Sequence, residues 1–148
     1  MAAFKGSFRI LIYEKNRLSL PAKLRRANEA AIYDHFVLTK GLEGCLFLFS
    51  FDEWGKIEEK LRNLSFTQAD TRLFIRSLLS QATDVILDTQ GRFIIPQPLL
   101  EEAKLGKGKE AVAVGNLNRI EIWSPAVWEN YLKSSPKSYE QVAESILL

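Results

Sequence analysis

The chain has 148 residues, enough for one large or two small domains, and its 47% hydrophobic and 26% charged residues are typical of a globular protein. No apolar run approaches the ~18 residues that a membrane-spanning helix needs. The N-terminal stretch has too short an apolar core, and no small-residue cleavage site, for an export signal. The single cysteine, Cys45, excludes an internal disulfide and suits a reducing compartment.

The net charge of +2 is distributed unevenly along the chain. Residues 1–26 contain seven lysines and arginines against one acid, Glu14, a net charge of +6, so the rest of the chain carries −4. A concentrated basic segment is typical of a surface that binds a polyanion. The same charges are also compatible with a solvated rim, and charge alone does not favour either interpretation.

In chain order, an apolar run rich in β-formers predicts a strand over residues 8–13. The polar segment Glu14–Asn16 predicts a turn, and residues 18–20 predict a second strand. Pro21 suits the first position of a helix, where its missing N–H would have no partner. We expect that helix to extend to about Ala31.

A second strand pair is predicted over residues 35–39 and 45–50, joined by a turn that contains two glycines. Ser50 and Glu53 have the spacing of a capping box, which predicts the start of a helix that carries Trp54. A further helix is predicted over residues 67–79, with Thr67 as its cap and a broad apolar face. It is expected to be a packed connector, because no Gly/Pro/Ser-rich linker surrounds it.

The same order of elements is then predicted a second time. Strands are expected at 85–87 and 93–95 around the turn Asp88–Gly91, followed by a helix from Pro98. A further strand pair is expected at 111–114 and 119–123.

Two more helices complete the prediction. Ser124 and Pro125 open a helix that contains Trp128, and Ser138 with Gln141 forms a capping box for a last short helix.

The two passages repeat at a fixed offset, which is typical of an internal duplication. The matching residues lie 75 or 74 positions apart: Arg17 and Arg92, Pro21 and Pro96, Gly41 and Gly115, Ser50 and Ser124, Trp54 and Trp128. Each copy is too short to bury a large core alone. We therefore expect the two copies to pack together as one unit.

No pattern of catalytic residues is present. His35 is the only histidine and has no neighbouring nucleophile or metal ligand, while Cys45 begins an apolar strand and is best interpreted as a buried hydrophobe. The adjacent acids Glu58–Glu59 and Glu101–Glu102 face different directions on helices and are interpreted as solvated surface. The sequence predicts no enzyme, no cofactor, no metal site and no small-molecule substrate.

The turn between Asp88 and Arg92 is more informative, because a carboxylate and a guanidinium four residues apart can pair across a hairpin. Together with this turn, four segments resemble the MraZ family of bacterial transcriptional regulators: LDTQGRFIIP, NRLSLPAKLR, FVLTKGLEGCLFLFSFDEW and NRIEIWSPAVWENYL. The resemblance extends over nearly the whole chain, from about Phe4 to Ile146.

The resemblance implies an α+β fold of two tandem, pseudo-symmetric AbrB-like hairpin and helix modules. These would form an intertwined, double-psi-like β-barrel with flanking helices. The expected organisation is a first, DNA-binding module at 1–62, a connecting helix at 63–80, a second module at 81–133 and a C-terminal helix at 134–148.

The resemblance also implies a function. Such a protein would be a cytoplasmic, nucleoid-associated repressor of the division and cell-wall gene cluster. It would bind direct repeats of double-stranded DNA in its own promoter as a ring of about 8 to 12 subunits, without a membrane partner. The residues implied for DNA binding are Lys15, Arg17, Lys23 and Arg25, while Asp88 and Arg92 would form a structural pair.

The first copy departs from the family motif at two positions: Tyr13 stands where an Asp is expected and Asn16 where a Gly is expected. Arg17 therefore lacks its carboxylate partner unless Glu14 replaces it. An alternative function is a ring-forming structural protein whose basic face binds an acidic partner rather than DNA.

Overall fold

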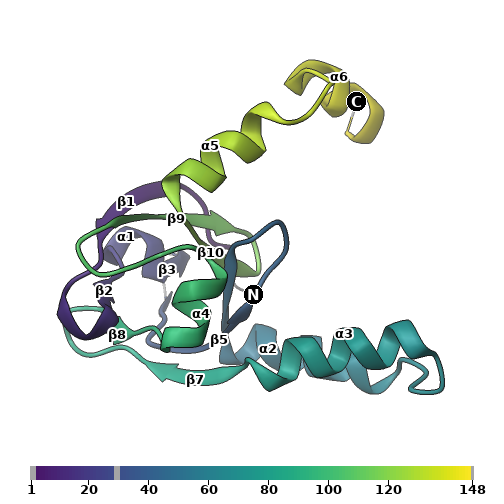
Figure 1. The fold of residues 1–148 in the computed structure, drawn as a ribbon, viewed down its shortest axis with the longest axis horizontal. Helices are drawn as coiled ribbons and strands as arrows, with labels where there is room; N and C mark the ends of the chain where they lie inside the picture. The colour runs from purple at the N-terminus through teal and green to yellow at the C-terminus, as the bar shows by residue number, and fades with distance from the viewer. Residues whose placement is uncertain (1–2, 29–30, 148) are drawn as a thin grey trace.

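The computed structural model describes residues 3–28 and 31–147 (Figure 1). The elements of the first half are β1 (Ser7–Leu11), a 3-10 turn η1 (Glu14–Asn16), β2 (Arg17–Ser19), α1 (Ala22–Arg25), β3 (Arg26–Asn28), β4 (Ala31–Ile32), β5 (His35–Lys40), β6 (Leu46–Ser50) and α2 (Phe51–Arg62). After α3 (Ala69–Ser80), the elements of the second half are β7 (Thr83–Ile86), β8 (Arg92–Ile94), α4 (Gln97–Glu102), β9 (Glu110–Asn116), β10 (Arg119–Trp123), α5 (Pro125–Lys133) and α6 (Tyr139–Ile146).

One antiparallel sheet contains strands of both halves. Its six strands lie in the order β1-β9-β10-β6-β5-β7, so each edge strand pairs with a strand of the other half. A separate two-stranded ribbon pairs β2 with β8. The two halves are therefore intertwined, and neither has a complete sheet of its own. In the described residues the strands form an open sheet and two two-stranded ribbons, β2–β8 and β3–β4, and no closed ladder of hydrogen bonds joins them.

The halves are related by an approximate two-fold axis. In the ribbon, Leu18 is paired with Phe93, 75 residues away, and in the sheet Phe47 is paired with Glu121, 74 residues away. Each of these pairs joins a residue to its own counterpart, which places both pairs on the axis. The tandem α+β organisation expected from the repeat is thus confirmed.

The core is formed jointly by both halves. Its largest cluster consists of buried side chains that include Ile12, Leu18, Leu20, Phe36, Leu38, Leu46, Leu48, Phe93, Ile95, Leu99, Ile120 and Ile122. Two smaller clusters cover other parts of the sheet. In one, Trp54 of α2 packs on Phe49 with ring centroids 5.7 Å apart, and in the other Trp128 of α5 packs on Trp123 at 5.0 Å. The two tryptophans occupy equivalent places, as their offset predicted.

The helix expected from Pro21 to Ala31 is much shorter, and that prediction was wrong. Helix α1 ends at Arg25, because Arg26 has an extended backbone and begins β3, which pairs with β4. The N–H of Tyr33 then donates to the carbonyl of Arg25, which returns the chain to the sheet. Local pairing of β3 with β4 therefore overrides the helix propensity of this segment. Residues 29 and 30 lie outside the described residues.

Ser50 precedes α2 at the predicted start of the helix, but the capping hydrogen bonds expected of Ser50 and of Thr67 are absent among the described residues. The Ser50 hydroxyl donates to Asp52 at 2.6 Å, and Glu53 accepts from Lys56 at 3.1 Å, so no capping box forms. The residue that precedes helix α3 is Gln68 and not Thr67. The Thr67 hydroxyl is hydrogen-bonded to the Ser65 hydroxyl.

The capping box of Ser138 and Gln141 in front of α6 is confirmed. None of the helices in the described part of the chain is long and apolar enough to cross a membrane.

Candidate nucleic-acid interface

The ribbon β2–β8 carries a polar turn at each of its two ends. The first turn is η1, where Lys15 and Asn16 adopt left-handed backbone conformations with φ of 62° and 58°. Such values are uncommon for residues other than glycine. The N–H of Tyr13 donates to the carbonyl of Arg17 at 2.7 Å and closes the turn. Lys15 is thereby held at an exposed tip.

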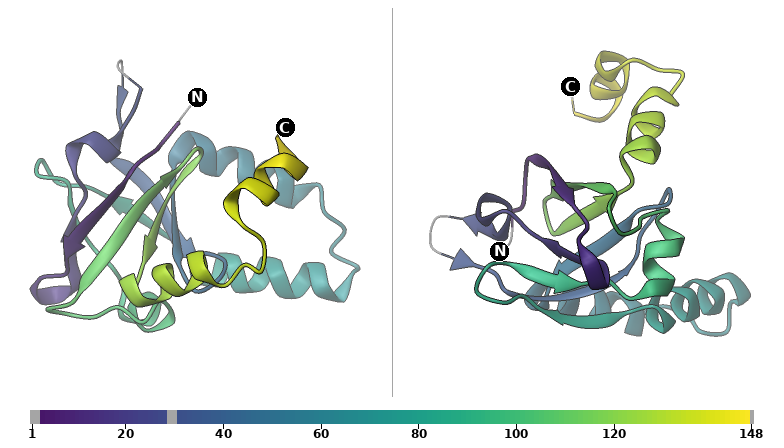
Figure 2. Two further views of the ribbon diagram at one scale, coloured as in Figure 1. Left: turned by 90° about the horizontal axis from the view of Figure 1, so that it is seen from above. Right: turned by 60° about the vertical axis from the view of Figure 1, so that its left-hand side comes forward.

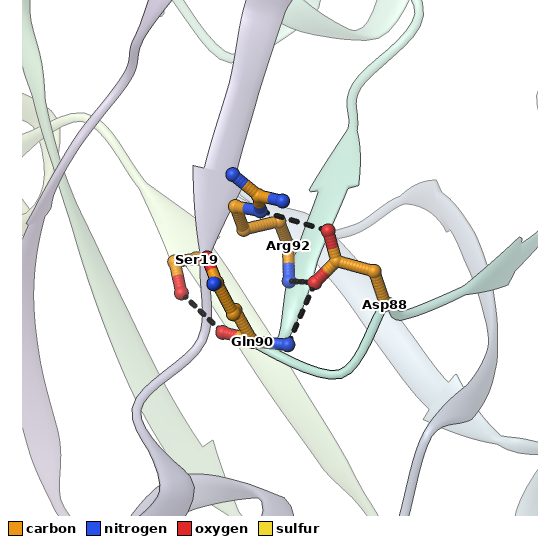
Figure 3. Close-up of polar contacts among 4 residues, drawn as sticks. All are labelled: Ser19, Asp88, Gln90 and Arg92. Atoms are coloured by element: carbon orange, nitrogen blue, oxygen red, sulfur yellow. Dashed lines mark hydrogen bonds and ion pairs between the residues drawn. The ribbon is translucent and has the colours of Figure 1, made fainter.

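The second turn is fixed by a carboxylate. One oxygen of Asp88 accepts the N–H groups of Gln90 and Arg92, both at 2.9 Å, and the other accepts Nε of Arg92 at 2.7 Å (Figure 3). These donors, led by the backbone N–H of Arg92, hold the pKa of Asp88 below its ordinary value. The Ser19 hydroxyl of β2 donates to the carbonyl of Gln90 at 2.8 Å. The second turn is therefore closed internally and tied to the neighbouring strand.

Arg17, the counterpart of Arg92, has no such partner. Tyr13 supplies no carboxylate, and Glu14 does not replace it, because its Oε1 lies 3.6 Å from Nζ of Lys107. Within the described residues, Arg17 makes no ion pair, and its side chain is half-exposed. It lines a depression of about 680 Å³ that extends over both turns and also includes Lys15. The first turn thus presents two available cations beside a second turn whose arginine is neutralised.

The other two predicted DNA-binding residues lie on α1. Lys23 is exposed, whereas Arg25 is half-buried, and its Nε has no hydrogen-bond partner among the described residues. A Cβ on Gly91 would lie 3.0 Å from Nε and Cζ of Arg25 and 2.7 Å from the carbonyl oxygen of Leu20. Gly91, with φ of 77°, is therefore required both by its conformation and by the close approach of the Leu20 carbonyl.

The structure adds two lysines that the sequence analysis did not identify. The loop between α4 and β9 lies beside the first turn, since the N–H of Ile12 donates to the carbonyl of Lys109 at 2.9 Å and that of Gly108 to Ile12 at 2.8 Å. Lys107 and Lys109 are exposed there. The signal in the sequence was the group of three lysines at 104, 107 and 109, but the net charge of −4 over residues 27–148 gave no indication of a basic segment there.

The equivalent place beside the second turn has the opposite charge. The carbonyl of Asp34 accepts the N–H of Leu87 at 2.8 Å, and Asp34 is the counterpart of Lys109 at an offset of 75. Lysines thus surround the first turn, whereas Asp34 and Asp88 lie at the second. The two ends of the ribbon therefore differ in charge, and they also differ in backbone conformation, since Lys15 is left-handed while its counterpart Gln90 is not.

The remaining candidates offer no catalytic arrangement. The imidazole of His35 is half-exposed and lies 3.6 Å from Asp34. Burial raises the pKa of the Cys45 thiol to about 12, so it is a poor nucleophile. No group of three or more His, Cys, Asp or Glu residues that could hold a metal ion occurs in residues 3–28 and 31–147.

A basic turn at the end of a two-stranded ribbon is compatible with a nucleic-acid-binding module, and the comparisons with known proteins support a DNA-binding regulator. A family model described as "MraZ protein, putative antitoxin-like" matches residues 3–77 and again residues 78–148. The chain is 44% identical over 144 residues to the transcriptional regulator MraZ of Desulforamulus reducens, covering 97% of each protein. It is also 44% identical over 144 residues to that of Desulfitobacterium hafniense, covering 97% of this chain and 96% of the relative.

A third relative, the transcriptional regulator MraZ of Caldanaerobacter subterraneus subsp. tengcongensis, is 44% identical over 141 residues, covering 95% of this chain and 94% of the relative. The chain belongs to the MraZ family. Its relatives are named transcriptional regulators, which are not enzymes, and this agrees with the prediction from the sequence.

Proposed function

We propose that this protein is a repressor that binds direct DNA repeats in its own promoter, upstream of a division and cell-wall gene cluster. The supporting observation is the contrast between the two turns. The first carries Lys15 and Arg17, and Arg17 makes no ion pair with the residues that the structure describes, while the second pairs Arg92 with Asp88 at 2.7 Å. The first module, residues 1–62, is therefore the proposed DNA-binding module.

The side chains of this end divide into two roles. Arg17 is the proposed reader, because a free guanidinium can donate two hydrogen bonds to O6 and N7 of guanine. Lys15 and Lys23 are proposed phosphate contacts, which fix register without reading sequence. Lys107 and Lys109 extend the same positive surface. Arg25 adds its positive charge to this surface. Its guanidinium lies against Gly91, where it also packs on the second turn.

A single turn offers few contacts, so binding of one subunit is expected to be weak. A ring of about 8 to 12 subunits, the number that the family resemblance implies, would present one turn per subunit to successive repeats. The second and later contacts are then intramolecular, and the effective concentration raises the overall affinity without any new contact. This is why the proposed operator contains repeats in place of one long site.

The proposal is tested by fluorescence anisotropy with a duplex from the region upstream of the gene and a scrambled duplex of equal composition. We expect tighter binding to the native duplex and an affinity that falls steeply with salt concentration. A protection footprint should then show evenly spaced protected segments. Equal binding to both duplexes, matched by binding to an acidic polypeptide, would instead favour a structural ring whose basic face binds an acidic partner.

A further inference from the structure

A groove with apolar walls lies between the helical hairpin α2–α3 and the strands β5 and β6. Its volume is about 430 Å³, and its walls include Phe47, Ile57, Leu61, Leu64, Phe74 and Leu78. Leu64 and Phe74 are 45% and 48% exposed, so this apolar groove is open to solvent. Two lysines, Lys40 and Lys60, are the charged residues that line it.

Helix α6 has an apolar face that no element in the described residues covers. Tyr139, Val142 and Ile146 share this face at positions i, i+3 and i+7, and Tyr139 and Ile146 are 85% and 80% exposed. A helix of this length is marginal in water without packing. Its only charged residues are Glu140 and Glu144. Helix α6 is thus an acidic, amphipathic segment without a partner.

Helix α6 and the groove do not meet within one chain. Figures 1 and 2 show α5–α6 and α2–α3 as separate arms that leave the body of the protein and diverge, with α6 at the far end of its arm. Helix α5 is fixed to the sheet through Trp128 and Trp123, and only residues 134–138 separate it from α6. An occupant from a second molecule is therefore favoured.

We infer that the apolar groove of one subunit receives α6 of a neighbouring copy of the same chain. The spacing of the exposed apolar residues is that of a helix which binds in a groove. Lys60 at the edge of the groove is complementary in charge to the acidic helix, whereas Lys40 is already paired with Glu102 at 3.2 Å. The contact joins two different surfaces, so it is heterologous and generates a closed ring when the rotation between subunits allows. The inference rests on the proposed ring and assigns its interface.

Cross-linking identifies the occupant directly. Two single variants, Leu64→Cys in the groove and Ile146→Cys on α6, are mixed and treated with a short bis-maleimide. We expect covalent dimers from the mixture but not from either variant alone, and a ladder of oligomers from the double variant. The native Cys45 provides the background control, since it is buried and its thiol pKa is raised to about 12. An intrachain link in the double variant, or no link, would overturn the inference.

A second measurement separates this inference from the proposed function. Replacing both Val142 and Ile146 with Asp should raise the concentration at which the ring assembles by roughly tenfold or more. Ser145→Asp, which adds a charge in the same turn beside the apolar face, is the matched control and should assemble normally. Mass is measured by light scattering, folding by thermal unfolding, and DNA binding on a duplex with one repeat.

The outcomes of this second measurement are distinct. Loss of assembly with unchanged one-repeat binding supports both proposals. A double variant that assembles like the parent overturns the interface but leaves DNA binding intact. A parent that assembles through α6 but shows no preference for its promoter repeat supports the interface and refutes the proposed function.

Discussion

Replacing Arg17 with Ala should remove sequence reading while leaving the fold intact. Arg17 has no ion pair in the described residues, so its loss leaves no buried charge without a partner. An arginine that contacts a guanine is worth ~1–3 kcal/mol, which corresponds to a roughly 5- to 140-fold increase in Kd for each engaged subunit. On a duplex with one repeat, anisotropy should show this loss for the native sequence and almost none for the scrambled sequence.

Arg92→Ala is the matched control, since Arg92 occupies the equivalent position in the second half. Its guanidinium is paired with Asp88, so its replacement should reduce the free energy of unfolding and leave the Kd for the repeat almost unchanged at equal folded fraction. Both variants are compared by urea unfolding and by anisotropy at the same salt concentration. If Arg17→Ala binds the repeat as tightly as the parent while Arg92→Ala loses it, the assignment of the two turns is refuted.

Three further outcomes are expected. Lys15→Ala should weaken binding to native and scrambled duplexes alike and lower the slope of log K against log salt by about 0.9, as measured by a salt titration. Leu18→Ala, at a fully buried position on the two-fold axis, should cost ~2–5 kcal/mol of unfolding free energy in urea, whereas Leu73→Ala, 66% exposed, should cost less than about 0.5 kcal/mol. Because the folded-state pKa of Asp88 is lowered, its pair with Arg92 contributes fully to the free energy of unfolding above about pH 4, and this contribution is lost as the pH falls through the folded-state pKa. Asp88→Asn should therefore flatten that part of an acid unfolding curve.

The sequence predicted the elements whose signals are local. Alternating or continuous apolar residues defined most strands, and the repeated Arg and Pro positions revealed the duplication. The segment after Pro21 failed because its composition favours a helix, while pairing between β3 and β4 determines its conformation. Ser50 occupies the predicted position before α2 but makes no capping hydrogen bond, because its hydroxyl is oriented to donate to Asp52 at 2.6 Å.

The candidate site was predictable only in part, for a related reason. Lys15 and Arg17 lie in one local turn, so their proximity follows from the sequence. Lys109 approaches that turn only because the N–H of Ile12 donates to its carbonyl, a contact set by long-range pairing. Arg25 was treated as a surface cation, yet the chain fold presses it against Gly91. No local spacing encodes contacts between residues so far apart in the chain.

Joining the two halves in one polypeptide allows each turn to change independently. In a homodimer of single modules, every substitution at one turn would be repeated at the other, so both ends would carry the same charge. Here Lys109 and Asp34 occupy equivalent places with opposite signs, and Arg92 is neutralised while Arg17 is not. The first turn is consequently the more positive of the two ends. A difference of this kind allows the proposed DNA contact to be confined to one end of the subunit.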